Sequence, residues 1–218
     1  MTATPLKLRD KAYGSFTERL LAREIKPGQF VSQRELVEIT GMPLGAIREL
    51  IPRLEAEGLI TTAPQRGMQV AHVDLNLIRN AYQFRLFIES QATALYAQAR
   101  SDEAIASIRA SHEAIIRRAQ NGEKEALIEE AQETDRLFHE AIIDHLENEI
   151  ISNAYRVNWI KIRLIRQNET RLYADLVIPV MRDHLRVIEA IERKDASGAV
   201  AAMAFHINQA RSRAINAE

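Results

Sequence analysis

Helix-breaking residues are distributed very unevenly along this chain of 218 residues, and the contrast limits what each half can fold into. Pro, Gly and Thr interrupt residues 27–73 at short intervals. From Asp74 to Ala217 there are only two Gly, Gly122 and Gly198, and one Pro, Pro179. A long segment of this kind, rich in Ala, Leu, Ile, Glu and Arg, favours helices over strands. We therefore expect a mainly α protein with one domain over residues 1–73 and another over residues 74–218.

Composition excludes several classes of protein. The chain has no cysteine, which rules out a disulfide scaffold and a thiolate metal site. No apolar run approaches the roughly 18 residues that span a bilayer, and residues 1–10 lack the apolar core of a signal peptide. We expect a cytoplasmic protein with no membrane partner. The formal net charge of −1 is too small to argue for nucleic acid by itself.

The first domain begins with the pattern of two helices. Apolar residues recur at helical spacing from Tyr13 to Leu21, and Pro27-Gly28 is expected to follow the end of that helix. Ser32, followed three residues later by Glu35, forms a capping-box pattern. This predicts a short second helix that stops at Gly41.

A third helix and a hairpin complete the first domain. The helix is expected to start near Pro43 and to end at Gly58, with Pro52 causing a kink or an early end because proline cannot donate the helical hydrogen bond. Residues 59–62 and 68–71 read as two strands around a turn. Helix, helix, turn, helix, hairpin is the order of a winged helix-turn-helix, which places its third helix in the DNA major groove.

The second domain reads as an antiparallel bundle of six helices, because the predicted connections are short. Pro179 suits the first turn of one helix, and Asp195 suits the N-cap of the last. The expected ranges are 75–100, 102–120, 123–146, 149–170, 179–193 and 195–215.

Four side chains of the bundle have the spacing of a metal site. Asp135 and His139 are four residues apart, about 400° of helix, and share one face. His184 and His206 stand at about the same height, ~15 Å from the turn at Lys194-Asp195. Three imidazoles and one carboxylate suit Zn²⁺, with Ni²⁺ or Mn²⁺ as alternatives. A hydrogen-bonded polar network in the core is the competing interpretation of the same spacing.

The other histidines lack comparable partners. His145 lies about 240° from His139 on the same helix and is left out of the group. His72 and His112 are expected at the surface.

Arginines near the expected cavity are candidates for binding an acid. Arg85 and Glu89 form an i,i+4 pair, which is an ordinary helix-face ion pair unless Arg85 faces the cavity and binds a carboxylate in bidentate fashion. Arg163, Arg166 and Asn168 are weaker candidates on the fourth bundle helix.

These motifs resemble a known family. Residues 27–36, PGQFVSQREL, are similar to the PG-x-x-L-S-E-R-E-L signature of GntR-type regulators. Residues 47–60 resemble the VRE…RLEAEGLV segment that follows, and residues 66–70 resemble the wing. The second half is similar to the FCD effector domain of the FadR subfamily, in its six-helix, VanR-like form. The matching motifs are Arg85-x-x-x-Glu89, Asp135-x-x-Phe138-His139, Asp183-His184 and Ala202-Met203-x-x-His206.

The resemblance implies a homodimeric transcription regulator that binds a DNA operator, with a small organic acid bound at the metal of the bundle. It also implies that Arg34, Arg48 and the wing pair Arg66-Gly67 contact DNA. Arg48 is off the apolar stripe of its helix and can reach guanine, Arg34 can hold a phosphate, and Gly67 lets the wing backbone approach DNA. An ordinary solvated face is the alternative for both helix arginines.

The sequence departs from the family at the tip of the third helix. The usual Ser-Arg-Thr-Pro is replaced by Pro43-Leu44-Gly45-Ala46, so Leu44 stands where an arginine is usual. Leu44 can contact a thymine methyl instead. Leu44 and Gly45 therefore join the expected DNA-binding residues.

Two other functions compete with a ligand-controlled regulator. An Asp/His₃ site with open positions can activate water, as in a metal-dependent hydrolase. No general base stands out, however, and the winged helix-turn-helix domain of residues 1–73, called the head below, would have no role in such an enzyme. The other is a dimeric structural module whose head has lost DNA binding through Leu44 and Pro52. We expect a regulator and not an enzyme.

Overall fold

The computed structural model describes residues 5–99, 102–123, 125–166 and 173–216. The chain divides into two compact units, Met1–Leu77 with Trp159–Ile165, and Ile78–Asn158 with Arg166–Glu218. The boundary expected after residue 73 lies close to the division at Leu77, whereas nothing in the sequence pattern assigns part of a later helix to the first unit. Among the described residues, no helix is both long enough and apolar enough to cross a lipid bilayer.

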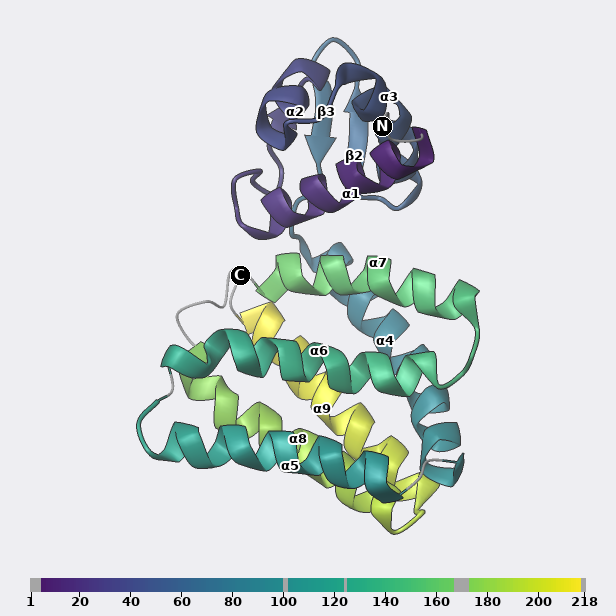
Figure 1. The fold of residues 1–218 in the computed structure, drawn as a ribbon, viewed down its shortest axis with the longest axis vertical. Coiled ribbons are helices and arrows are strands. Elements are labelled where there is room, and N and C mark those ends of the chain that lie inside the picture. The colour runs from purple at the N-terminus through teal and green to yellow at the C-terminus, as the bar shows by residue number, and fades with distance from the viewer. Residues whose placement is uncertain (1–4, 100–101, 124, 167–172, 217–218) are drawn as a thin grey trace. The chain divides into compact units, whose positions relative to one another are not determined.

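The first unit contains a winged helix-turn-helix (Figure 1). Its three helices pack on one another, and its three short antiparallel strands have the order β1-β3-β2. The β2–β3 hairpin was expected, while the two-residue strand β1 was not. The bounds are α1 Pro5–Leu21, β1 Phe30–Val31, α2 Gln33–Thr40, α3 Leu44–Ala56, β2 Ile60–Ala63 and β3 Gly67–Val70.

The predicted caps of α2 are confirmed. The Glu35 backbone N–H donates to Ser32 Oγ at 3.1 Å, and the Ser32 backbone N–H donates to the Glu35 carboxylate at 2.7 Å. Gly41 ends the helix in the left-handed region with φ +68°. Because both ends of α2 are fixed in this way, its apolar residue Leu36 is held in the core beside Ile47 of α3.

Pro52 does not end α3, and the expectation of an early end there is wrong. The helix continues from Leu44 to Ala56 with Pro52 inside it. Burial of Ile47, Leu50 and Leu54 on its inner face stabilises the helix on both sides of the missing hydrogen bond. Tertiary packing therefore overrides the local preference.

The second unit is a helical bundle (Figure 1). In the described residues it comprises six α-helices, as expected, and helix α8 packs against both α5 and α9. Helix α6 packs against α5 and α8, with a short 3₁₀ turn at Glu125–Leu127 before it. The bounds are α4 Leu75–Ala99, α5 Asp102–Gln120, α6 Ile128–Asp144, α7 Glu149–Arg166, α8 Tyr173–Glu192 and α9 Ala196–Asn216.

The two expected helix starts in the last third of the chain have different outcomes. Asp195 caps α9, because its side chain accepts the Gly198 backbone N–H at 2.8 Å. Pro179 was expected in a first turn but lies inside α8, which begins at Tyr173. Val177, Val180 and other apolar residues of α8 are buried on both sides of this proline, so packing again maintains the helix.

Candidate metal centre and nucleic-acid interface

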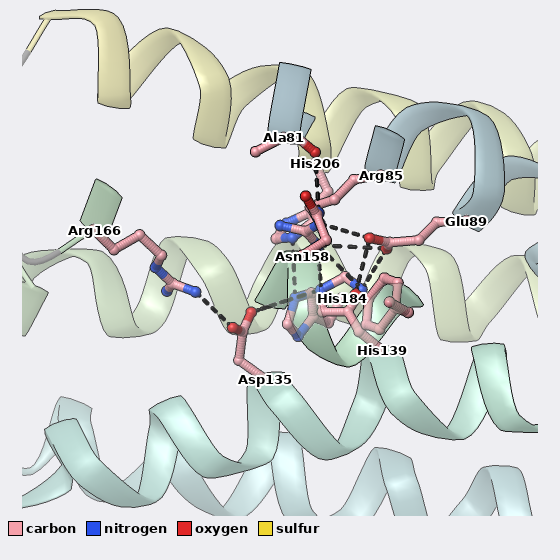
Figure 2. Close-up of polar contacts among 10 residues, drawn as sticks. Ala81, Arg85, Glu89, Asp135, His139, Asn158, Arg166, His184 and His206 are labelled. Carbon is pink, nitrogen blue, oxygen red and sulfur yellow. Dashed lines mark hydrogen bonds and ion pairs between the residues drawn. The ribbon is translucent and has the colours of Figure 1, made fainter. Parts of the chain in front are cut away.

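Four buried side chains converge at the centre of the bundle. Helix α6 contributes Asp135 and His139, helix α8 contributes His184, and helix α9 contributes His206 (Figure 2). One donor atom from each lies within 4.8 Å of the others, and no side chain is more than 2% exposed. His184 Nε2 is 3.3 Å from both Asp135 Oδ1 and His206 Nε2. The convergence expected from the spacing is therefore present.

His139 is oriented by a carboxylate from α4. Its Nδ1 lies 2.6 Å from Glu89 Oε2, which can only accept a proton from it. In the neutral ring, Nε2 then has no proton and carries a lone pair. That nitrogen lies 3.7 Å from Asp135 Oδ1 and 3.1 Å from Arg85 Nη2. A carboxylate behind a histidine is the usual arrangement behind a metal-binding imidazole.

The charges of the group favour neutral rings at His184 and His206 and an ionised carboxylate at Asp135. Burial lowers the pKa of His184 to about 3, and burial next to His184 lowers the pKa of His206 well below its ordinary value. Burial alone would raise the pKa of Asp135, but the Arg166 guanidinium holds it well below the usual range. For His139, burial opposes the cationic form, yet the charge of Glu89 raises its pKa.

The Arg85–Glu89 pair is fully buried, and not on a solvated helix face. Arg85 Nε donates to Glu89 Oε1 at 2.5 Å, and the Tyr155 hydroxyl donates to the same oxygen at 3.0 Å. Burial opposes ionisation of Glu89, but Arg85 lowers its pKa to about 2. The pair therefore holds a carboxylate beside His139 as a fixed charge.

A small cleft, with a free volume of about 10 Å³ and so with room for about one water molecule, lies against the four-residue group. Asp135 and His206 line it together with three arginines, Arg85, Arg166 and Arg213. Arg166 Nη1 donates to Asp135 Oδ2 at 2.7 Å, which leaves Oδ1 directed at the histidines (Figure 2).

The arginines of the cleft differ in part from those expected. Arg163 is exposed and does not line the cleft, and Asn168 lies outside the described residues. Arg213 was missed. The signal for it was its spacing of seven residues, about two turns, from His206, which places both side chains on one face of α9.

His112 is not at the surface as expected. It is 1% exposed on α5, and its Nε2 lies 3.1 Å from His184 Nδ1. An isolated histidine on an amphipathic helix gives no sequence signal for such a contact, because the partner is on α8. His72 is exposed, as expected.

All six residues expected to contact DNA are solvent-exposed in the first unit. At the start of α3, Leu44 is 41% exposed. The Arg34 side chain is 90% exposed, and Arg48 Nε donates to the Gln33 side-chain oxygen at 3.3 Å. In the wing, the Arg66 guanidinium lies 4.6 Å from the centre of the Phe30 ring. The remaining two are Gly45 and Gly67.

Gly67 has a structural reason of its own. Its φ is +86°, and a Cβ there would lie 2.7 Å from the carbonyl oxygen of Val31. Glycine is therefore required for β3 to pair with β1 at this point, whether or not the wing contacts DNA. Gly45 has an ordinary helical backbone, and nothing would lie within 4 Å of an added Cβ.

A winged helix-turn-helix followed by an all-helical domain is the architecture of a bacterial transcription regulator. Family comparisons agree with it: residues 8–70 match the bacterial regulatory proteins of the gntR family, and residues 80–209 match the FCD domain. The chain therefore belongs to the GntR family of transcription regulators and carries an FCD domain. These domains belong to regulators and not to enzymes, which removes the basis for the hydrolase alternative.

Individual relatives are distant. The chain is 27% identical to the Nta operon transcriptional regulator of Aminobacter aminovorans over 65% of each chain, so the match spans less than two thirds of that protein. It is 22% identical to the HTH-type regulator YdhC of Bacillus subtilis, over 90% of this chain and 86% of that one. The solved structure of Escherichia coli McbR is similar with a TM-score of 0.75 and 19% identity, covering 99% of both chains. That likeness supports the fold alone.

Proposed function

We propose that this GntR regulator binds a DNA operator as a homodimer, with an affinity controlled by a small carboxylate that binds at a divalent metal in the bundle. The observation that carries the proposal is the buried Asp/His₃ group, two of whose members, Asp135 and His206, line an arginine-lined cleft. Operator binding implies a cytoplasmic protein.

The donor set fits a divalent ion. Asp135, His139, His184 and His206 would hold it through one oxygen and three nitrogens, a combination that suits Zn²⁺ first and Ni²⁺ or Mn²⁺ next. Nε2 of His184 and Nε2 of His206 face each other at 3.3 Å beside an ionised carboxylate, and a cation bound there would be stabilised by the carboxylate and by a lone pair from each ring. When bound, the ion supplies positive charge and open coordination positions for the effector.

The effector is proposed to be a small organic acid because the cleft is cationic. Arg213, Arg166 and Arg85 line it, while Glu89 offsets the charge of Arg85 and Asp135 that of Arg166. Arg213 is therefore the proposed anchor for a carboxylate. Arg163, which the sequence also suggested, does not line the cleft, and Asn168 lies outside the described residues.

The homodimer is proposed from exposed apolar side chains on two helices that pack together. Phe87 and Leu95 on α4 are 64% and 51% exposed, and Ile150 on α7 is 81% exposed. The Asn158 amide donates to the Ala81 carbonyl oxygen at 3.1 Å and so ties α7 to α4. Exposed large apolar side chains are candidates for a surface that a partner covers.

Elemental analysis of the purified protein tests the metal site. We expect bound metal in the wild type and its loss in Asp135→Ala and His184→Ala, because each removes one of four ligands. His145→Ala is the matched control, since His145 is the C-cap of α6 and is outside the group. Equal metal content in all four proteins would contradict the ligand assignment.

A gel-shift titration on DNA from upstream of the protein's own gene tests the head. Arg48→Ala is expected to cost about 1–3 kcal/mol of discrimination between operator and unrelated DNA, because we propose that Arg48 reads bases. Arg34→Ala should weaken binding to both DNAs alike, as loss of a phosphate contact does. Unchanged selectivity of Arg48→Ala would show that it does not read bases.

Small carboxylic acids added to the wild type should shift its operator affinity.

A further inference from the structure

A fifth histidine adjoins the proposed metal site without being one of its ligands. His112 is on α5, which contributes none of the four donors. It is buried, with its ring 5.2 Å from that of His184 and 5.3 Å from that of Phe138. Its two nitrogens have different partners: Nδ1 lies 2.7 Å from the Ile108 carbonyl oxygen and Nε2 lies 3.1 Å from His184 Nδ1.

These two contacts fix a direction of hydrogen bonding. A carbonyl oxygen only accepts, so His112 Nδ1 must carry a proton. In the neutral ring His112 Nε2 is then an acceptor, and His184 Nδ1 must donate to it. This contact puts the proton of His184 on Nδ1 and leaves Nε2 with a lone pair, while the ionised Asp135 oxygen beside Nε2 favours the opposite placement. A cation between Nε2 and the carboxylate removes that conflict. That nitrogen is the one at 3.3 Å from both Asp135 Oδ1 and His206 Nε2.

We propose that His112 is a positioning residue for the metal site: it holds the proton of His184 on Nδ1, fixes the plane of the ring, and so directs Nε2 at the ion. The proposal rests on the metal site of the proposed function. A backing partner sets which nitrogen of a histidine ligand is free and which way the ring faces.

The neighbouring ligands show what His112 adds. Glu89 backs His139 in the same way, through Nδ1 at 2.6 Å. His206 Nδ1 has no hydrogen-bond partner among the described residues. Two of the three imidazoles are thus held from behind, one by a charged carboxylate from α4 and one by a neutral histidine from α5. Loss of His112 would leave His184 as weakly oriented as His206.

The first test measures Zn²⁺ affinity of the full chain by competition with a chromogenic chelator. His112→Phe keeps a ring beside Phe138 but cannot accept a hydrogen bond, and it should bind Zn²⁺ about 10–100-fold more weakly. His112→Gln, whose amide oxygen can accept, should recover part of that loss. His145→Phe is the control, because His145 makes an edge-to-face contact with Tyr96 and is not one of the four donors, so the affinity should be unchanged. Affinity of His112→Phe within about twofold of wild type would overturn the proposal.

The second test needs no bound metal. Long-range ¹⁵N–¹H NMR spectra of the metal-free wild type report which nitrogen of each histidine carries the proton. We expect the His184 proton on Nδ1, and its loss from that position in folded His112→Phe. A His184 proton on Nε2 in the wild type would overturn the proposal. If the wild type binds no Zn²⁺ at all, the proposed function fails, and the NMR result still decides whether His112 orients His184.

Discussion

Two glycines of the head, both expected to contact DNA, differ in what the fold requires of them. Gly67 has a left-handed backbone and touches the Val31 carbonyl, whereas Gly45 is an exposed residue in the first turn of α3. The same substitution therefore has opposite expected effects at the two positions, and stability measurements separate the structural role of each from its role in binding.

Replacing Gly67 with alanine should destabilise the head. The new Cβ would meet the Val31 oxygen at 2.7 Å, and alanine is strained at φ +86°. We expect a loss of about 1–3 kcal/mol in the free energy of unfolding, measured by urea denaturation. A variant as stable as the wild type would show that β1 can move away from β3 at little cost.

Replacing Gly45 with alanine should stabilise the protein by about 0.4–1 kcal/mol, because alanine loses less backbone freedom in a helix and meets no neighbour here. Urea denaturation measures this gain. If Gly45 lies against the DNA backbone, the same variant should bind the operator more weakly. A destabilised Gly45→Ala protein would contradict the open surroundings of this residue.

At the scale of an element, α3 contains an exposed proline that its packing does not need. Pro52 leaves the Arg48 carbonyl without its helical donor, and Pro52→Ala restores that donor without removing a buried group. We expect a gain of about 1–3 kcal/mol, seen as a higher melting temperature. Pro43→Ala is the control. Pro43 is the N-cap, where a missing N–H matters little, so its effect should be small. No gain for Pro52→Ala would mean that α3 has adapted fully to the proline.

The helices were predictable from the sequence where local chemistry sets them. The capping box at Ser32, the left-handed Gly41 and the N-cap at Asp195 are each defined by a few neighbouring residues. Elements that depend on contacts with residues far away in the sequence were not predictable in this way. The strand β1 exists because Phe30 and Val31 pair with β3, and Pro179 lies inside a helix because buried residues surround it.

The residues of the candidate site also fall into two groups: those that spacing along the sequence predicts and those whose position depends on how the helices pack. Asp135 and His139 share a helix face, and His184 and His206 are matched across a helical hairpin, so simple spacing brought them together. His112 could not be found in this way, since its position depends on how α5 packs against α8.

At the scale of the whole molecule, bound metal should make folding stability depend on chelators. An ion that binds only the folded state adds about 2.7 kcal/mol when its free concentration is about 100-fold above the dissociation constant. We expect a chelator to lower the melting temperature of the wild type measured by circular dichroism. The Asp135→Ala protein should melt at one temperature with or without the chelator. A wild-type melting curve that the chelator leaves in place would argue against a bound ion.

The four donors join α6 to α8 and α9, from residue 135 to residue 206, in a chain without a single cysteine. An ion at this position would be a reversible cross-link that closes a long loop, as a disulfide does in secreted proteins. Unlike a disulfide, it forms under reducing conditions and exchanges with the surrounding ion pool. The rigidity of the effector domain would then follow the metal supply of the cell.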